Sequence, residues 1–227
     1  MNNAPYIRCR KIHPFNLDDW DAVGAAFHDA DFAPFQQGWI QQPTPGFRPA
    51  RAAAAWSGEL LYIHAQLKDD DIFNTMPGCE FNSLAINHGD VFEIFLQPSG
   101  QESYHEIHVT PNNQKFQLRI PCPGAFQKLK NRFTSNDDMI QSFKVWTPIV
   151  ESRVKIDKSA QTWLVIVKIP LTMLAENIPA APGVKWRFSF CRYDYTRPDT
   201  TPTYSSTSPH SAINYHLVHE YGTMEFC

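Results

Sequence analysis

Apolar and polar residues alternate one by one along several short segments of this chain, and this pattern constrains the fold most. In the segment Leu60–Lys68, apolar side chains occupy every second position from Leu61 to Leu67. Segments 91–97 and 104–110 alternate in the same way. A period of two places alternate side chains on opposite faces of a β-strand. Further strands are predicted at 145–156, 161–169, 184–194 and 222–226.

Short polar connections join most of these segments. The five residues PSGQE at 98–102 make a hairpin loop between the strands at 91–97 and 104–110. Helical patterns are limited to 17–27 and 171–177. Roughly ten strands joined mainly by short turns predict an all-β fold. We expect an antiparallel β-sandwich or jelly roll with one or two short helices.

The chain length and apolar content fit one β-sandwich. The sequence has 227 residues, of which 43% are hydrophobic, so it can bury a sizeable core. We expect a single domain over 1–227, in which 1–49 form an N-terminal strand and an irregular lead-in and 50–226 form the main body. Trp56, Trp163 and Trp186 lie in predicted strands and are expected in the core.

Charge and hydropathy exclude several classes of partner. The formal net charge is −3 and no Lys/Arg-rich run occurs, so we expect no nucleic-acid binding. No segment approaches the ~18 apolar residues of a membrane span, so no membrane partner is expected. The N-terminus lacks the apolar stretch of a signal peptide. We therefore expect a cytoplasmic protein or a trimmed secreted one, and a monomer.

Two glutamates and a histidine are predicted to share one face of neighbouring strands. Glu93 lies on the strand at 91–97, and Glu106 and His108 lie on its hairpin partner. Like charges placed close together across a strand pair are unfavourable. Arg192 or Lys168, on other predicted strands, could offset them. The face is either a polar surface that binds hydroxylated ligands or a solvated face with a local salt bridge.

The motif HEIHV at 105–109 does not predict a metal site. His105 and His108 are three positions apart on a strand, so their side chains point to opposite faces. The same objection applies to His216 and His219 if that segment is extended. Ordinary polar or packed histidines are the favoured interpretation.

An acidic run, Asp69–Asp71, follows the strand at 60–68. Clustered carboxylates can hold Ca²⁺ with the help of carbonyl groups, and Asn74 is nearby. Asp69 and Asp71 are therefore candidate Ca²⁺ ligands, although a solvated acidic turn is the commoner outcome. No cofactor is required by any motif.

Motifs of nucleophilic or phosphate chemistry are absent from the sequence, including G-x-S-x-G and the P-loop. Glu93 and Glu106 could lie at the ~5 Å separation of a retaining glycosidase. Catalytic carboxylates must also flank the bond that breaks, which neighbouring strand residues rarely do. Binding is therefore favoured over catalysis.

Aromatic residues outside the periodic segments are candidate sugar platforms. Tyr204 lies in the segment 196–211, whose Thr, Ser and Pro residues predict a long loop. Trp39 also lies in a non-periodic segment. A loop aromatic either contacts ligand or packs back on the sandwich.

The order of four segments resembles that of family 9 carbohydrate-binding modules, first known as appendages of xylanases. These segments are ELLYIHAQLKDDDI, GDVFEIFLQP, YHEIHVTPNNQ and KWRFSFCRYDYTR, followed by a closing YGTMEF. Together they span about residues 50–226. The resemblance implies a β-sandwich that binds glucose- or xylose-based chain ends without catalysis, clamps a sugar between two aromatics and carries structural Ca²⁺.

Glu93 matches the glutamate of the family's strand, and Tyr204 lies in the loop that supplies one clamping aromatic. The second aromatic has no counterpart, because Ala85–His88 contains no Trp. We therefore predict that the chain binds an oligosaccharide or polysaccharide chain end. The candidate sugar-binding residues are Glu93, Glu106, His108, Arg192, Tyr204 and His88.

Two alternatives from other classes stay open. Related sandwich domains of the DOMON type bind b-type haem through Met and His, and this chain offers Met76 and nine histidines. The other alternative is a glycoside-active enzyme that uses Glu93 and Glu106.

Overall fold

The computed structural model describes residues 4–77, 82–147, 150–175 and 180–227, and most of them belong to β-strands. Sheet A contains β5 (Val91–Gln97), β6 (Tyr104–Val109), β7 (Lys115–Ile120), β10 (Lys185–Asp194), β11 (Thr203–Ser206) and β12 (Gly222–Phe226). Sheet B contains β2 (Ala33–Pro34), β3 (Ala50–Ser57), β4 (Leu60–Lys68), β8 (Glu151–Asp157) and β9 (Thr162–Pro170). The first strand, β1 (Tyr6–Lys11), pairs with both sheets.

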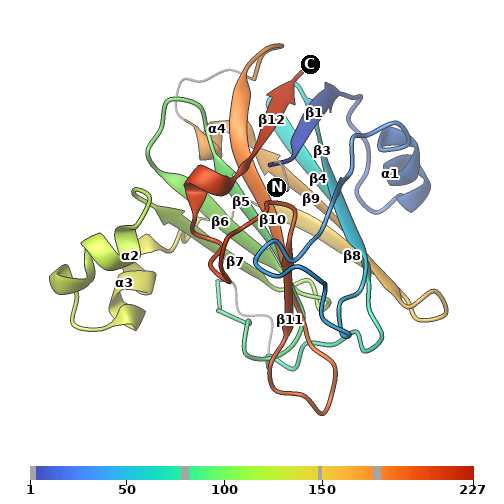
Figure 1. The fold of residues 1–227 in the computed structure, drawn as a ribbon. Helices are drawn as coiled ribbons and strands as arrows, with labels where there is room; N and C mark the ends of the chain where they lie inside the picture. Colours follow the sequence, from blue (N-terminus) through green and yellow to red (C-terminus); the bar gives the residue numbers. More distant parts are fainter. Residues whose placement is uncertain (1–3, 78–81, 148–149, 176–179) are drawn as a thin grey trace.

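Because β1 joins sheet A to sheet B, the strands form one continuous curled sheet (Figure 1). Its order is β7-β6-β5-β10-β12-β1-β3-β4-β9-β8. In addition, β11 pairs with β10 and β2 pairs with β3. The sandwich-like arrangement confirms the predicted class, but the sheet is mixed rather than purely antiparallel. The parallel pairs are β1 with β12 and β1 with β3. Parallel neighbours need a long connection, which residues 12–49 provide between β1 and β3.

The main apolar core lies between the facing sides of the two sheets. Alternate residues of β5 and β10 point into it from sheet A, and alternate residues of β4 and β9 point into it from sheet B. Trp56, Trp163 and Trp186 are all buried there, as predicted. Burial of this apolar surface is the main force that holds the two sheets together.

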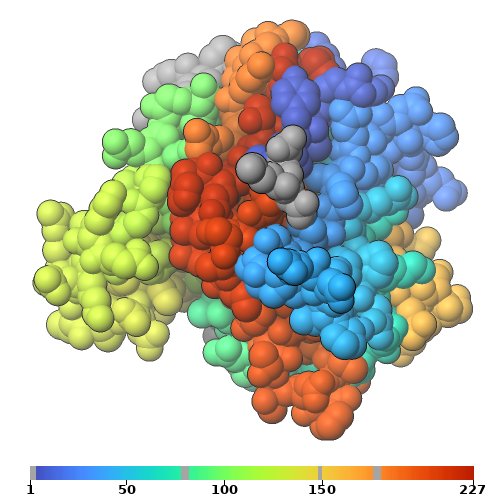
Figure 2. Space-filling view, viewed as in Figure 1, coloured from blue at the N-terminus to red at the C-terminus, as the bar shows by residue number. Residues whose placement is uncertain are grey.

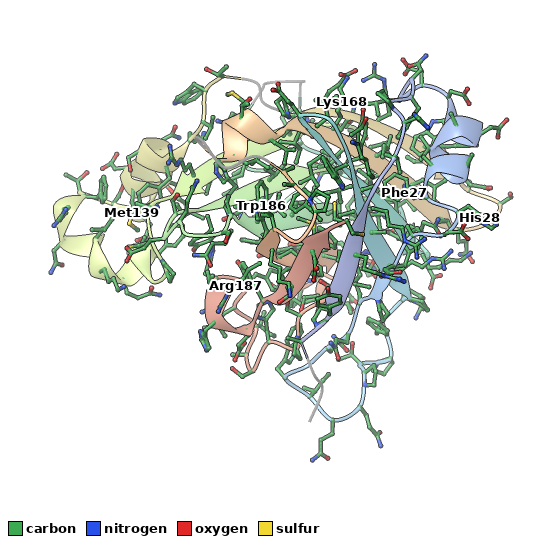
Figure 3. The ribbon with its side chains drawn as sticks, turned by 90° about the horizontal axis from the view of Figure 1, so that it is seen from above. Phe27, His28, Met139, Lys168, Trp186 and Arg187 are labelled. Atoms are coloured by element: carbon green, nitrogen blue, oxygen red, sulfur yellow. The ribbon has the colours of Figure 1, made fainter. Side chains whose placement is uncertain are left out.

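Four short α-helices occur in the described part of the chain, more than predicted: α1 (Trp20–Ala26), α2 (Ala125–Lys128), α3 (Asn136–Phe143) and α4 (Leu171–Leu174). Helix α1 covers the outer face of sheet B, and α2 and α3 project beside sheet A (Figure 1). From above, Met139 of α3 and Phe27 at the end of α1 lie on opposite sides of the molecule, with Trp186 between them (Figure 3).

Strands β5 and β6 are buried on both faces, whereas the alternation predicted one inward apolar face and one outward polar face. Every residue of Val91–Leu96 and of Tyr104–Val109 is buried. A second apolar cluster covers the outer face of sheet A, with contributions from α2, α3 and the segment before β12. The polar residues of this face are therefore enclosed by protein.

Most predicted strands match the structure closely, and 60–68 and 91–97 coincide with β4 and β5. The strand predicted from 145 begins later, at Glu151, and residues 148–149 lie outside the described ones. The helix predicted at 171–177 corresponds to α4, and residues 176–177 also lie outside. The predicted loop 196–211 contains β11. No helix of the described chain is long and apolar enough to cross a membrane.

Candidate functional site

A cavity of about 250 Å³ lies on the outer face of sheet A. Strands β5, β6 and β7 supply its floor, and α2, α3 and the segments 84–86 and 213–216 supply much of its wall. In Figure 2 the C-terminal segment, in red, lies against the helical segment, in yellow-green. The lining residues are Leu84, Ile86, Glu93, Phe95, Glu106, His108, Phe116, Leu118, Phe126, Ile140, Tyr193, Ile213, Asn214, Tyr215 and His216.

Glu93, Glu106 and His108 meet at the floor of this cavity, and we call them the pocket cluster. The strand register places Glu93 directly opposite His108. Glu106 lies two residues before His108 on β6, on the same face of the sheet. His108 Nε2 lies 2.7 Å from Glu106 Oε1 and 3.1 Å from Glu93 Oε1. The predicted proximity of the two glutamates is confirmed, and His108 lies between them.

The pKa values of the three groups in the pocket cluster shift in different directions. Burial raises the pKa of Glu93 to about 8. Attraction to His108 opposes this rise, and repulsion from Glu106 adds to it. Burial acts to raise the pKa of Glu106 as well, but the hydrogen bond and charge of His108 bring it below its usual range. Burial acts to lower the pKa of His108, yet the two carboxylates raise it. At neutral pH, Glu93 is therefore mostly protonated and Glu106 is ionised, and His108 takes up a proton more readily than a free histidine.

Several atoms of the pocket cluster lack a hydrogen-bond partner among the described residues. They are Glu93 Oε2, Glu106 Oε2 and His108 Nδ1, all buried. Buried polar atoms are normally paired, and an unpaired one costs about 1–3 kcal/mol. The unpaired atoms border a cavity, so a bound ligand could satisfy them.

His216 extends the polar floor. Its Nε2 lies 3.9 Å from Glu106 Oε2, and its Nδ1 lies 3.0 Å from the Tyr104 hydroxyl. From the sequence, His216 and His219 were expected to point to opposite faces of an extended segment. In the structure Val218–Glu220 forms a 3₁₀ turn, and His219 is largely exposed. No local motif signals that His216 reaches the cavity, because its position depends on how the C-terminal segment folds over sheet A.

Aromatic rings form much of the wall. The Phe116 ring lies 4.9 Å from that of His108, and the Phe126 ring lies 4.8 Å from that of His216. Tyr193 and Tyr215 also line the cavity. Tyr204 lies on β11 opposite Tyr193, with ring centroids 5.0 Å apart, and is not among the lining residues.

Arg192 lies on the other face of sheet A. It is paired in register with Phe92, whose side chain belongs to the main core. Its guanidinium group donates to the Lys68 carbonyl at 2.6 Å and to Asp69 Oδ2 at 2.8 Å. The expected compensation of Glu93 and Glu106 by Arg192 therefore does not occur. Lys168 instead pairs with Glu151 in sheet B.

A second set of buried carboxylates surrounds Arg192, and we call Asp69, Asp90, Asp194 and Arg192 the arginine cluster. Candidate ligand oxygens of the three aspartates lie within 4.8 Å of one another. Asp194 lies 3.1 Å from the Arg192 guanidinium. Burial raises the pKa of Asp90 to about 8 and that of Asp194 to about 7, with repulsion from Asp69 in both cases.

The three carboxylates of the acidic run Asp69–Asp71 separate instead of converging. Asp69 joins the arginine cluster, Asp70 pairs with Arg48, and Asp71 pairs with Arg197. The predicted pairing of Asp69 with Asp71 in one metal site is not found. Asp69 instead lies beside Asp90 and Asp194. These two aspartates come close because β5 and β10 are neighbouring strands.

His88 and Met76 lie away from the cavity floor. The backbone carbonyl of His88 accepts a hydrogen bond from Thr75, and the carbonyl of Met76 accepts one from Gln114. Neither residue lines the cavity. Of the residues proposed from the sequence for sugar binding, the structure brings Glu93, Glu106 and His108 together at the cavity.

The fold is that of family 9 carbohydrate-binding modules of known structure. The family 9 module of Caldicellulosiruptor kristjanssonii superposes with a TM-score of 0.62 in its complex with cellotriose, at 13% identity over 98% of this chain and 93% of that one. Its complex with glucose gives 0.63, at 12% identity over 98% and 96%. A protein from Bacteroides uniformis ATCC 8492, proposed to bind carbohydrate, gives 0.72, at 14% identity over 99% and 100%.

No family model and no curated protein matches the sequence itself. At these low identities the likeness concerns the path of the backbone. The side chains of the cavity therefore have to be interpreted from their own geometry.

Proposed function

We propose that the protein binds carbohydrate in the cavity above the pocket cluster. The observation that carries this proposal is a cavity with buried carboxylates at its floor and aromatic rings in its wall. Sugar hydroxyls donate hydrogen bonds to carboxylates, and such charge-assisted bonds are stronger than neutral ones. The apolar faces of a sugar ring suit flat aromatic surfaces. The fold shared with modules that bind glucose and cellotriose supports the same conclusion.

The size of the cavity favours one sugar ring, or the end of a chain, over an internal stretch of polysaccharide. Its volume of about 250 Å³ is just below the typical range for small-molecule pockets, ~300–1,000 Å³. Glucose- and xylose-type sugars are the ligand class that we propose. Ile86 and Leu84 line the wall in the segment where the clamping Trp is missing. Phe116, Phe126 and Tyr215 offer the aromatic surface instead.

Calorimetric titration with glucose, xylose, cellotriose and xylotriose tests this proposal. We expect binding of at least one sugar with a Kd of ~1 mM or below, which corresponds to about −4.1 kcal/mol or stronger. Glu106→Gln removes the ionised acceptor and should weaken binding by about tenfold, because hydrogen bonds to charged groups contribute ~1.5–3 kcal/mol. Glu102→Gln, at an exposed position of the same hairpin, is the matched control.

Two results would contradict the proposal. The first is that none of the four sugars binds at millimolar concentration. The second is that Glu106→Gln and wild type bind equally well, which would place the sugar elsewhere. Similar affinities for glucose and cellotriose would support the single-ring cavity.

We also infer that the arginine cluster holds Ca²⁺. Three buried carboxylates surround one guanidinium group, so a second cation is needed to balance their charge when all three are ionised. The donor set consists of oxygens alone, which Ca²⁺ prefers. Asp69, Asp90 and Asp194 would hold the ion, and its charge would stabilise the carboxylates in their ionised form. Its role would be structural, because Asp69 follows β4 of sheet B and the other two flank strands of sheet A.

A further inference from the structure

We propose that Glu93, Glu106 and His108, with His216 beside them, form a binding site for a divalent transition-metal ion such as Zn²⁺ at the floor of the cavity. This site goes beyond sugar binding and does not depend on it. The ion would be held by side chains from β5 and β6 and by the segment that covers sheet A.

The spacing of the ligand atoms suits such an ion. One oxygen of each carboxylate and one ring nitrogen of His108 lie within 4.8 Å of one another. Ligands about 2.0–2.2 Å from a tetrahedral Zn²⁺ stand roughly 3.3–3.6 Å apart. To reach that spacing, the distance from His108 Nε2 to Glu106, 2.7 Å, must lengthen by about 0.6–0.9 Å and the distance to Glu93, 3.1 Å, by about 0.2–0.5 Å, shifts that side-chain rotation can supply.

Unpaired atoms in the pocket cluster provide independent support for a ligand. Glu93 is 2% exposed, and its Oε2 has no hydrogen-bond partner in the described part of the structure. Glu106 Oε2 is likewise buried and has no hydrogen-bond partner there, since His216 Nε2 lies 3.9 Å away. Protein side chains alone thus leave two carboxylate oxygens unsatisfied at the edge of a cavity. A cation in contact with both carboxylates would remove this cost.

His216 is placed to contribute as a further ligand. The contact of its Nδ1 with the Tyr104 hydroxyl fixes the ring and leaves Nε2 directed toward Glu106. Metal-bound histidines characteristically use their second ring nitrogen in a hydrogen bond of this kind. With Glu93, Glu106 and His108, this gives two oxygen and two nitrogen donors.

The donor set distinguishes this site from the arginine cluster. Imidazole nitrogen together with carboxylate oxygen suits Zn²⁺, Mn²⁺, Fe²⁺ or Co²⁺, whereas Ca²⁺ and Mg²⁺ prefer oxygen donors alone. The adjoining cavity gives the ion a route of entry. It also leaves space for water or a ligand oxygen next to the metal.

Calorimetric titration of chelator-treated protein with ZnCl₂ tests the site, and the visible absorption of added Co²⁺ reports its coordination. We expect one equivalent to bind to wild type. Glu106→Gln and His108→Gln should weaken binding by roughly 100-fold or more, since even residues that only orient metal ligands alter affinity by 10–100-fold. His219→Gln changes a largely exposed histidine nearby and should leave binding within about twofold of wild type.

Equal affinity of Glu106→Gln and wild type would overturn the site, as would the absence of stoichiometric binding. If either pocket variant fails to fold, the imidazole NMR signals of wild type decide. Paramagnetic Co²⁺ should shift the signals of His108 and His216, and shifts confined to other histidines would refute the proposal. Sugar titrations with and without Zn²⁺ separate the two hypotheses: sugar binding without metal binding defeats only the metal site, and the reverse defeats only the sugar proposal.

Discussion

The two faces of sheet A both bury charged groups, but they compensate the charge differently. On the inner face, the fully buried guanidinium group of Arg192 contacts Asp69 and Asp194. Arginine stays protonated at all accessible pH values. On the outer face, His108 lies between Glu93 and Glu106 beside a cavity. A permanent cation at the end of the core suits a structural role, whereas exchangeable protons beside a cavity suit ligand binding.

Two histidines of β6 show the same contrast within one strand. His105 points inward and its Nε2 donates to the Leu174 carbonyl oxygen at 3.0 Å, and burial lowers its pKa to about 4. His108, three positions later, points outward, where two carboxylates raise its pKa. Strand geometry alone predicted the opposite directions. The opposite directions of the two pKa shifts depend on what packs against each face.

The largest predicted effect concerns Arg192. Arg192→Met leaves Asp69 and Asp194 buried without their cation, so we expect a loss of about 3–5 kcal/mol in the free energy of unfolding. Urea denaturation at pH 7.5 in the presence of a chelator measures it. The control Arg8→Gln removes an ion pair whose arginine side chain is 53% exposed, and it should cost far less because solvent screens the pair. A loss below 1 kcal/mol for Arg192→Met would show that the inner face does not depend on this cation.

The next effect is a pH dependence that originates on the inner face. The folded pKa of His105, about 4, lies below the 6.5 of an unperturbed histidine, so the unfolded chain takes up the proton first as the pH falls. Its contribution to stability is complete above pH 6.5 and is lost as the pH falls toward 4. By pH 4.5 the loss is about 2–3 kcal/mol.

Denaturation at pH 7.5 and 4.5 checks this dependence in wild type, His105→Gln and His219→Gln. His105→Gln should lose less stability on acidification than wild type by that amount, whereas the exposed control His219→Gln should behave like wild type. His64 in sheet B, whose pKa burial also lowers to about 4, keeps its own contribution in all three. An identical pH dependence in His105→Gln and wild type would mean that His105 is protonated in the folded state.

Metal ions provide a third way to separate the two faces. Ca²⁺ at 10–100 times its Kd should stabilise wild type by about 1–3 kcal/mol through the arginine cluster. Asp90→Asn should abolish this stabilisation and retain Zn²⁺ binding, while Glu106→Gln should do the reverse. Thermal denaturation with each ion measures both responses. Loss of both responses in a single variant would indicate one shared site and would contradict the assignment of separate ions to the two faces.

The sequence predicted the strands well because each strand faces an apolar core on one side, and alternation reports that side directly. It also predicted that Glu93, Glu106 and His108 share a face, since a short hairpin loop restricts the register of β5 and β6. The expectation that Arg192 offsets the charges of Glu93 and Glu106 was wrong because of the strand register. Arg192 pairs with Phe92 rather than with Glu93, and a shift of one residue in register changes the face.

Other features depend on contacts between distant segments, which no local pattern reports. His216 and Phe126 reach the cavity because a C-terminal segment and an inserted helix fold over sheet A. Asp90 and Asp194 meet Asp69 because two sheets close at one end. Glu93 of β5, with Glu106 and His108 of β6, therefore resembles part of an outward polar face in sequence, although all three are buried in the structure.

The smallest predicted effect concerns Tyr204, which the sequence placed in a loop and the structure places on β11. Its ring contacts Tyr193 and Tyr215, which line the cavity, while Tyr204 does not. Tyr204→Ala should therefore weaken sugar binding only about two- to fivefold, in line with the ~0.5–1 kcal/mol of an aromatic pair. Tyr193→Ala removes part of the wall itself and should have the larger effect. Calorimetry with the best-bound sugar measures both, with Tyr6→Ala as an exposed control. A greater loss for Tyr204→Ala than for Tyr193→Ala would show that the sugar contacts β11 directly and that the ligand site extends beyond the cavity toward that strand.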